Sequence, residues 1–379
     1  MFTFSGTASL WQAEVGVNDH EILIGQCAAL SAAAAGLGTG VNQVLNAWVA
    51  EVNGTGGING RKLRLVTADD VYDPDKWVEG TAKLIEEDKV FALAGYVGTA
   101  TTKVAIPIVT EAKVPLVGAF TGAGLLRKDE KTGKPHRYGI NFRASYGNET
   151  ETMVEHLTKD LGMSKIACST RMIPSARPAA GTEAALKKRS LALVSKGTCE
   201  RNTIAVKKGL ADVLSGSPEA VVMVGPHKPV ATFLAEAKTT ELQARFATVS
   251  FVGTENLTTK AAANGERVII SQVVPSPADA SVPLVKDYLA ALTATYPDAK
   301  PGYVSLEGYA SARLLGIGLA KAGKELTREG LVNAFDQLAE TDLGGMDMHL
   351  SADDHQGSDL VYLTEVTAGV AKQLTALSR

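Results

Sequence analysis

Apolar runs of strand length alternate with segments of helical periodicity along most of the chain. Glu21–Ala28 has the length and composition of a buried strand. The pair Asp73-Pro74 supplies an N-cap and a proline at the first helical position of a later helix. After the first strand, apolar residues recur at helical spacing, at Val41, Val44, Leu45, Trp48, Val49 and Val52. Strands that alternate with helices form parallel sheets, so the pattern predicts an α/β protein with doubly wound sheets.

Two such series follow one another, which suits a protein of two α/β lobes. The first has predicted strands at residues 21–28, 62–68, 90–95 and 115–119, with a helix at 101–112. The second begins near Tyr138, with strands at 138–142, 165–167, 220–224 and 248–252 and helices at 148–161, 181–188 and 229–239. A strand at 268–273, helices at 284–296, 305–322 and 328–338, and short antiparallel strands at 346–350 and 359–367 complete the prediction.

Composition narrows the class of protein. The 379 residues are 45% hydrophobic and include 37 glycines, which suits two α/β lobes rich in turns. The formal net charge is −3, and acids and bases are mixed along the chain, which gives no indication of nucleic-acid binding. The apolar runs Phe91–Val97 and Ala310–Ala322 are too short or too interrupted by glycine to span a bilayer.

Motifs that carry catalysis are missing from the sequence. It has no GxSxG nucleophile turn, no GxxxxGK[ST] phosphate loop and no HExxH metal motif. Its three cysteines lack CxxC spacing. His349 and His355 lie near three aspartates, but acidic turns of this kind are more often solvated surface than metal sites. We therefore expect no catalytic residues, no cofactor and no metal.

The first residues, Met1–Ala13, have the small and apolar character of the end of a signal peptide. A secretory signal also needs a basic segment, and no Lys or Arg occurs before Arg61. Residues 1–20 are interpreted as the remnant of a truncated signal peptide, with a disordered tail as the alternative.

Seven blocks of sequence follow one another in a distinctive order. They are ILIGQCAALS (22–31), VNGTGGINGR (52–61), DDVYDP (69–74), GYVGTATT (95–102), VPLV (114–117), FRASY (142–146) and EGY (307–309). Each block alone is a weak pattern, but their order and spacing together are specific. With these blocks the chain resembles the Leu/Ile/Val-binding-protein-like family of periplasmic (type I) solute-binding proteins, from Glu21 nearly to the end.

This resemblance implies two lobes that are joined by three crossovers and close on a solute by a hinge motion. The crossovers are expected near Arg143, Gln272 and Gly345. Lobe 1 then comprises residues 21–142 and 273–345, and lobe 2 comprises 143–272 and 346–379. The resemblance further implies a monomeric receptor that docks on the membrane permease of an ABC importer.

The resemblance also implies the residues that bind the solute. Thr99 matches a serine that holds the ligand carboxylate, in the turn before Ala100 and Thr101. The turn Phe120-Thr121-Gly122 matches a loop that offers a carbonyl and a hydroxyl to the same ligand. From lobe 2, His227 falls where members often have a tyrosine, and Glu255 matches an acid that pairs with the ligand ammonium. The alternatives are a plain helix cap at Thr99 and a solvated acid at Glu255.

Cys168–Pro178 (CSTRMIPSARP) departs from the family pattern, in which a turn such as FYQDDSFG is expected. Codons exist for this stretch that spell FYQDDSFG in a shifted reading frame. A local frameshift is one hypothesis, and a true insertion of unrelated sequence is the other. In either case the cleft loses a tyrosine and aspartates and gains Arg171 and Arg177, which predicts weakened or altered binding.

The sequence therefore predicts an extracytoplasmic receptor of an ABC importer, which binds an amino acid, an amide or a small carboxylate. A cytosolic amide or amino-acid sensor with the same fold is the alternative, and an enzyme is a more distant one. Thr99 and Glu255 together favour a zwitterion. Leu37 falls where several members stack an aromatic side chain on the ligand, so the sequence leaves the solute unidentified.

Overall fold

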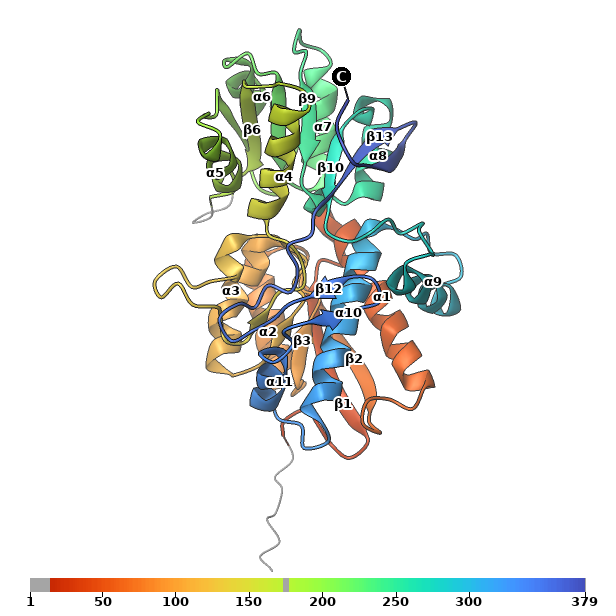
Figure 1. Cartoon of the computed structure of the whole chain (residues 1–379). Coiled ribbons are helices and arrows are strands. Elements are labelled where there is room, and N and C mark those ends of the chain that lie inside the picture. The colour runs from red at the N-terminus through yellow and green to blue at the C-terminus, as the bar shows by residue number, and fades with distance from the viewer. Residues whose placement is uncertain (1–13, 173–176, 379) are drawn as a thin grey trace, which may run out of the picture.

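The computed structural model describes residues 14–172 and 177–378. Met1–Ala13, the segment interpreted as a signal remnant, lies outside the described residues. The chain forms two α/β lobes, each built around its own sheet (Figure 1). The predicted fold class is confirmed. None of the helices in the described part of the chain is long and apolar enough to cross a membrane.

The first lobe contains a parallel five-stranded sheet in the order β2-β1-β3-β4-β5. Side chains alternate between its faces, so Ile22 and Ile24 pack under α1 and α10 while Leu23 faces α2 and α3. The strands are β1 (Glu21–Ala28), β2 (Lys62–Asp69), β3 (Ala92–Ala94), β4 (Leu116–Val117) and β5 (Gly139–Ile140). The helices are η1 (Ala32–Ala34), α1 (Ala35–Gly54), α2 (Pro74–Glu86), α3 (Thr99–Glu111), η2 (Gly124–Leu126), α9 (Pro283–Thr295), α10 (Tyr303–Ala322) and α11 (Arg328–Phe335).

The second lobe contains a seven-stranded sheet in the order β14-β13-β10-β9-β8-β6-β7. Its strands are parallel except for β13 and β14, which add to one edge in antiparallel orientation. The strands are β6 (Ile166–Arg171), β7 (Lys196–Cys199), β8 (Ala220–Val224), β9 (Arg245–Thr248), β10 (Ile269–Gln272), β13 (Tyr362–Thr367) and β14 (Val370–Leu374). The helices are α4 (Tyr146–Lys159), α5 (Ala180–Lys188), α6 (Lys207–Leu214), α7 (His227–Ala237), η3 (Ser250–Val252), α8 (Thr254–Ala261) and η4 (Ala262–Gly265).

Two predicted strands end four residues away from the observed ends. The strand predicted at 248–252 is observed at Arg245–Thr248, because η3 and Gly253, with a φ of +73°, turn the chain toward α8. The strand predicted to end at Ala167 continues as β6 to Arg171, since its residues pair with both β7 and β8. The unusual segment therefore begins inside the sheet, not after it.

The path of the chain after α11 bears on the position of the third crossover. The short strands β11 (Thr341–Asp342) and β12 (Asp347–Met348) pair with each other. The chain then stays with lobe 1, where Asn141 pairs with Gln356 and the N–H of Gly357 donates to the Asn141 carbonyl. It joins the second sheet only at β13. We therefore propose that the third crossover follows Gly357 and does not lie near Gly345.

Candidate functional site

Loops at the carboxyl ends of the strands in both sheets meet between the lobes. This edge is where open parallel sheets bind ligands. From lobe 1 it receives Tyr72, which follows β2, and the start of α3, which follows β3. From lobe 2 it receives Arg171 at the end of β6 and Phe251 in η3. Side chains of the two lobes contact one another inside this cleft.

Two threonine hydroxyls form its centre on lobe 1. Thr99 Oγ1 and Thr121 Oγ1 lie 2.8 Å apart, and both side chains are buried. Tyr146 at the start of α4 lies beside them, with its hydroxyl 3.3 Å from Thr121 Oγ1. The structure thus brings together two predicted site residues that are 22 positions apart.

Thr99 is the first residue of α3, and its N-cap Gly98 offers no side-chain cap. The backbone N–H groups in the first turn of a helix lack intrahelical acceptors and attract anions. Gly98 has a φ of +103°, and a Cβ there would lie 2.6 Å from the Tyr72 ring. Only glycine fits this turn without strain. The N–H groups of Thr99 and Ala100 and the paired hydroxyls are therefore suited to a carboxylate.

The other predicted residues of lobe 1 have different roles. The Thr101 hydroxyl donates to the carbonyls of Val97 and Gly98, at 2.6 and 2.9 Å, so it stabilises the helix start. The Gly122 carbonyl accepts the N–H of Tyr146 at 2.6 Å. The Phe120 ring packs on Phe251 with 5.9 Å between centroids. These residues shape the site and join it to lobe 2.

His227 begins α7 and is buried. Burial, with smaller contributions from Lys228 and Lys260, lowers the pKa of its imidazole to about 4. Its Nδ1 atom has no hydrogen-bond partner among the described residues. No contact found within residues 14–172 and 177–378 joins it to the threonine pair, so its role in binding stays a prediction.

Glu255, in the first turn of α8, makes a contact between the lobes. Its Oε1 atom accepts the N–H of Tyr303, the first residue of α10, at 2.9 Å. Burial raises the pKa of the carboxyl. The carboxylate thus caps a lobe 1 helix from lobe 2, and its predicted pairing with a ligand ammonium stays untested.

A buried ionic cluster joins the lobes behind the cleft. Arg143 contacts Glu149 of α4 and Glu307 of α10, and its Nη1 atom lies 3.2 Å from Glu307 Oε1. Glu149 also accepts hydrogen bonds from the Ser271 hydroxyl and the Ser250 N–H. Burial alone lowers the pKa of a guanidinium, but the two carboxylates raise the pKa of Arg143 above its usual value. The first crossover is therefore fixed to both lobes by charge.

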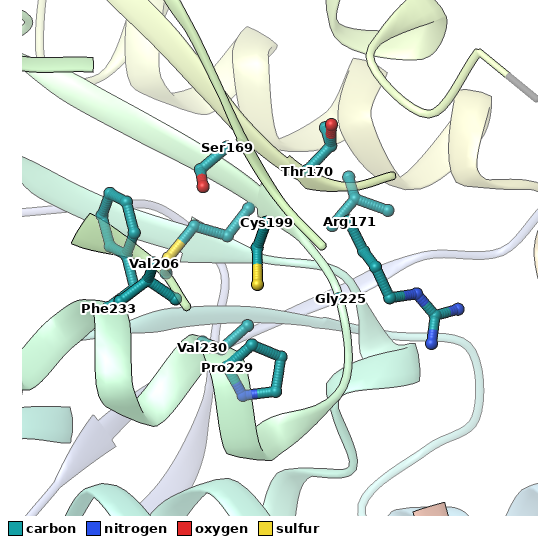
Figure 2. Close-up of a pocket in the computed structure, with 11 residues that line it drawn as sticks. Ser169, Thr170, Arg171, Cys199, Val206, Gly225, Pro229, Val230 and Phe233 are labelled. Atoms are coloured by element: carbon teal, nitrogen blue, oxygen red, sulfur yellow. The ribbon is translucent and has the colours of Figure 1, made fainter. Parts of the chain in front are cut away.

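Two cavities lie near the cleft. The larger, of about 430 Å³, is lined by Thr99, Tyr146 and Arg177 among others, and its size suits a small molecule. The smaller, of about 20 Å³, lies inside lobe 2 among Cys199, Val206 and Phe233 (Figure 2). It has room for about one water molecule, so it is no solute site.

Several residues of the site were missed by the sequence analysis. Tyr72, Tyr146 and Phe251 supply aromatic surface, and Arg201 joins Arg171 against Tyr72. A signal was present for Tyr72 and Tyr146, because each lies in a block that resembles the family. Charged residues inside apolar surroundings were a further signal, at Phe142-Arg143-Ala144 and Leu306-Glu307-Gly308.

A family model described as periplasmic binding protein matches residues 21–371. The structure of a "possible leucine/isoleucine/valine-binding protein" from Rhodopirellula baltica SH 1 is 32% identical, with a TM-score of 0.88, and the match covers 94% of this chain and 96% of that one. A substrate-binding periplasmic protein from Ralstonia solanacearum is 25% identical, with a TM-score of 0.85 over 93% and 100% of the two chains.

A curated relative matches over a shorter stretch. An amino acid binding protein of Pseudomonas aeruginosa is 36% identical over 64 residues, which is 17% of this chain and 17% of that protein. The predicted resemblance is confirmed by the family model and the solved structures.

Proposed function

The chain belongs to the periplasmic binding protein family, and from that premise we propose that it is the extracytoplasmic receptor of an ABC importer. It binds a small polar solute between its lobes and releases it unchanged to a membrane permease. The solute is an amino acid, an amide or a small carboxylate. The receptor acts as a monomer and needs no cofactor.

The observation that carries this proposal is the Thr99–Thr121 hydroxyl pair at the uncapped start of α3. Two hydroxyls and free N–H groups at one point form a site for a carboxylate. From lobe 2, the Tyr146 hydroxyl lies 3.3 Å from Thr121 Oγ1, and the Tyr146 ring contacts the ring of Phe251. A ligand that contacts both lobes favours the closed form, which is the conformation that such a receptor presents to its permease.

A thermal-shift screen of the full chain against amino acids, their amides and small organic acids tests the proposal. A solute at about 100 times its Kd stabilises the folded chain by about 2.7 kcal/mol, which raises Tm measurably. Calorimetric titration of each hit then gives its affinity, and chromatography of the incubated solute shows whether it is unchanged. The proposed function is rejected if no solute raises Tm, or if a hit is converted to a product.

A further inference from the structure

Two arginines of lobe 2 meet one tyrosine of lobe 1 inside the cleft. Arg171 is 5% exposed, and its Nη1 atom donates to the Tyr72 hydroxyl at 2.7 Å. Its Cζ atom lies 5.2 Å from the centre of the Tyr72 ring, and Arg201 Cζ lies 5.3 Å from the same centre. Arg201 also donates to the Tyr72 backbone carbonyl. Two guanidinium groups therefore lie against a single aromatic ring.

The charge of this pair is poorly compensated. Among the residues that the structure describes, neither Arg171 nor Arg201 forms an ion pair. The Nε atoms of both are buried without a partner. Burial, and then the charge of Arg171, lower the pKa of Arg201 although Tyr72 and two acids raise it. A buried cation without an anion is costly, so the buried Arg171 beside the half-buried Arg201 indicates a missing anionic partner.

One acid whose charge acts on Arg201, Asp70, does not fill that place. Asp70 Oδ1 accepts the N–H of Tyr72, while Oδ2 is buried without a partner in the described part of the chain. Burial raises the pKa of this carboxyl to about 7, so it carries only part of a negative charge near neutral pH. Asp70 belongs to lobe 1. Its charge raises the pKa of Arg201, and the charge of Arg201 in turn lowers the pKa of Asp70.

The arginine pair lies close to the carboxylate site. The Tyr72 ring packs on Gly98, the residue before Thr99. Arg171 Cζ is 5.9 Å from the ring of Phe251, which also contacts the rings of Phe120 and Tyr146. In Figure 2 the Arg171 guanidinium is turned away from the apolar pocket around Val206 and Phe233. A solute held at the threonine pair therefore has its far end near the guanidinium groups.

We propose that the solute carries a second carboxylate, bound by Arg171 and Arg201. The solute class is an acidic amino acid or a short dicarboxylate. The planar guanidinium presents N–H groups in a fork that fits a carboxylate, and such charge-assisted hydrogen bonds are stronger than neutral ones. The inference rests on the proposed function, because the solute must first bind between the lobes.

The test compares pairs of nearly equal shape by calorimetric titration of the full chain, aspartate with asparagine and glutamate with glutamine. The acid of at least one pair is expected to bind at least about tenfold more tightly than its amide, because hydrogen bonds to a charged group are stronger than those to a neutral one. Two chain lengths are used because the separation of the two carboxylates is not known in advance.

Variants assign the preference to the arginines. Arg171→Gln and Arg201→Gln are expected to remove most of the preference for the acid while amide binding changes little. Arg171→Lys keeps the positive charge and is expected to retain part of the preference for the acid. Arg64→Gln, an exposed arginine of lobe 1 paired with Glu21, is the matched control and is expected to leave it unchanged. Circular dichroism verifies the folding of each variant.

The outcomes separate the two proposals. Equal or tighter binding of both amides overturns the second carboxylate but leaves the receptor function in place. An acid preference that survives in both glutamine variants overturns the role of the arginines. If no amino acid, amide or organic acid binds at all, the proposed function fails, and this inference falls with it. The wild-type comparison needs no variant, so a variant that fails to fold does not prevent a decision.

Discussion

The hydroxyl groups of Thr99 and Thr121 hydrogen-bond to each other, although Thr99 begins α3 and Thr121 lies in the loop after β4. Thr99→Val or Thr121→Val removes one hydroxyl at nearly constant volume and leaves the other without its partner. We expect the free energy of unfolding to fall by about 1 kcal/mol and the affinity for solute to fall about tenfold. Chemical denaturation and calorimetric titration measure the two effects separately.

Thr110→Val in the same helix is the control for this pair. Its hydroxyl is exposed and donates to the Ile106 carbonyl. The variant is expected to keep the wild-type affinity. Equal affinities of Thr99→Val, Thr121→Val and the control would show that the threonine pair is structural, and the carboxylate site would have to lie elsewhere.

His227 makes a separate prediction about pH. Burial lowers the pKa of its imidazole from 6.5 to about 4, so the folded state binds fewer protons than the unfolded state between these values. Stability from neutral His227 is therefore complete above pH 6.5 and is lost as the pH falls toward 4. His227→Gln removes this dependence.

As the pH falls from about 7.5 to about 5, the free energy of unfolding of the wild type should decrease by about 2 kcal/mol more than that of His227→Gln. Urea denaturation at several pH values measures it. His20→Gln, at an exposed position, is the control. A constant difference between wild type and variant across this range would contradict a neutral, buried imidazole.

At the scale of elements, burial decides which strands the sequence reveals. β8, Ala220–Val224, is buried throughout, so its continuous apolar run predicts its exact limits. The edge strand β7, Lys196–Cys199, alternates between exposed and buried positions over only four residues and was missed. Its short, polar sequence gives no signal without the neighbouring β6 to pair with.

The residues of the candidate site also differ in how far the sequence predicts them. The turn at Thr99 was predictable because a turn that opens a helix after a strand is a local pattern, while the role of Thr99 in binding stays a prediction. The Arg171–Tyr72 contact joins residues 99 positions apart on different lobes, and it forms only when the lobes come together. No local periodicity encodes such a contact. The sequence predicted that the cleft loses a tyrosine and gains Arg171. The contact of Arg171 with Tyr72 could be seen only in the folded structure.

The segment Cys168–Pro178 carries its own prediction. Its residues 173–176 lie outside the described residues, while Arg171 ends β6. Replacement of the segment by the family turn FYQDDSFG restores a tyrosine and two aspartates and removes Arg171. Neutral amino acids are expected to bind more tightly than to the wild type, and the preference for an acid over its amide should shrink, because an aspartate repels a second carboxylate.

Titration of glutamine and glutamate against the wild type and the replaced chain measures both changes. Equal affinities in the two chains would count against any role of this turn in binding. The nucleotide sequence is a separate test of its origin. Codons that are incompatible with FYQDDSFG in the shifted frame would reject the frameshift and leave an insertion.

At the scale of the whole molecule, closure also depends on direct contacts between the two lobes. The ionic cluster around Arg143 holds the first crossover, whereas Glu255 joins α8 of lobe 2 to the start of α10 in lobe 1. The same region is packed tightly, because a Cβ on Gly253 would lie 2.6 Å from Leu37. The lobes therefore have a contact surface that favours closure independently of any solute.

Glu255→Ala removes one of these contacts and leaves the N–H of Tyr303 without its acceptor. Because closure and binding are coupled, a shift of the free chain toward open forms lowers the apparent affinity in proportion to the population of the closed form. The loss of one hydrogen bond to a charged group, about 1.5–3 kcal/mol, corresponds to a decrease in affinity of about tenfold or more.

Small-angle scattering should show a larger radius of gyration for the free variant than for the free wild type, and the two should converge at saturating solute. Glu79→Ala, at an exposed position of α2, is the control. A variant that binds more weakly at an unchanged radius of gyration would instead place Glu255 in direct contact with the solute, as the family resemblance implies for the ligand ammonium.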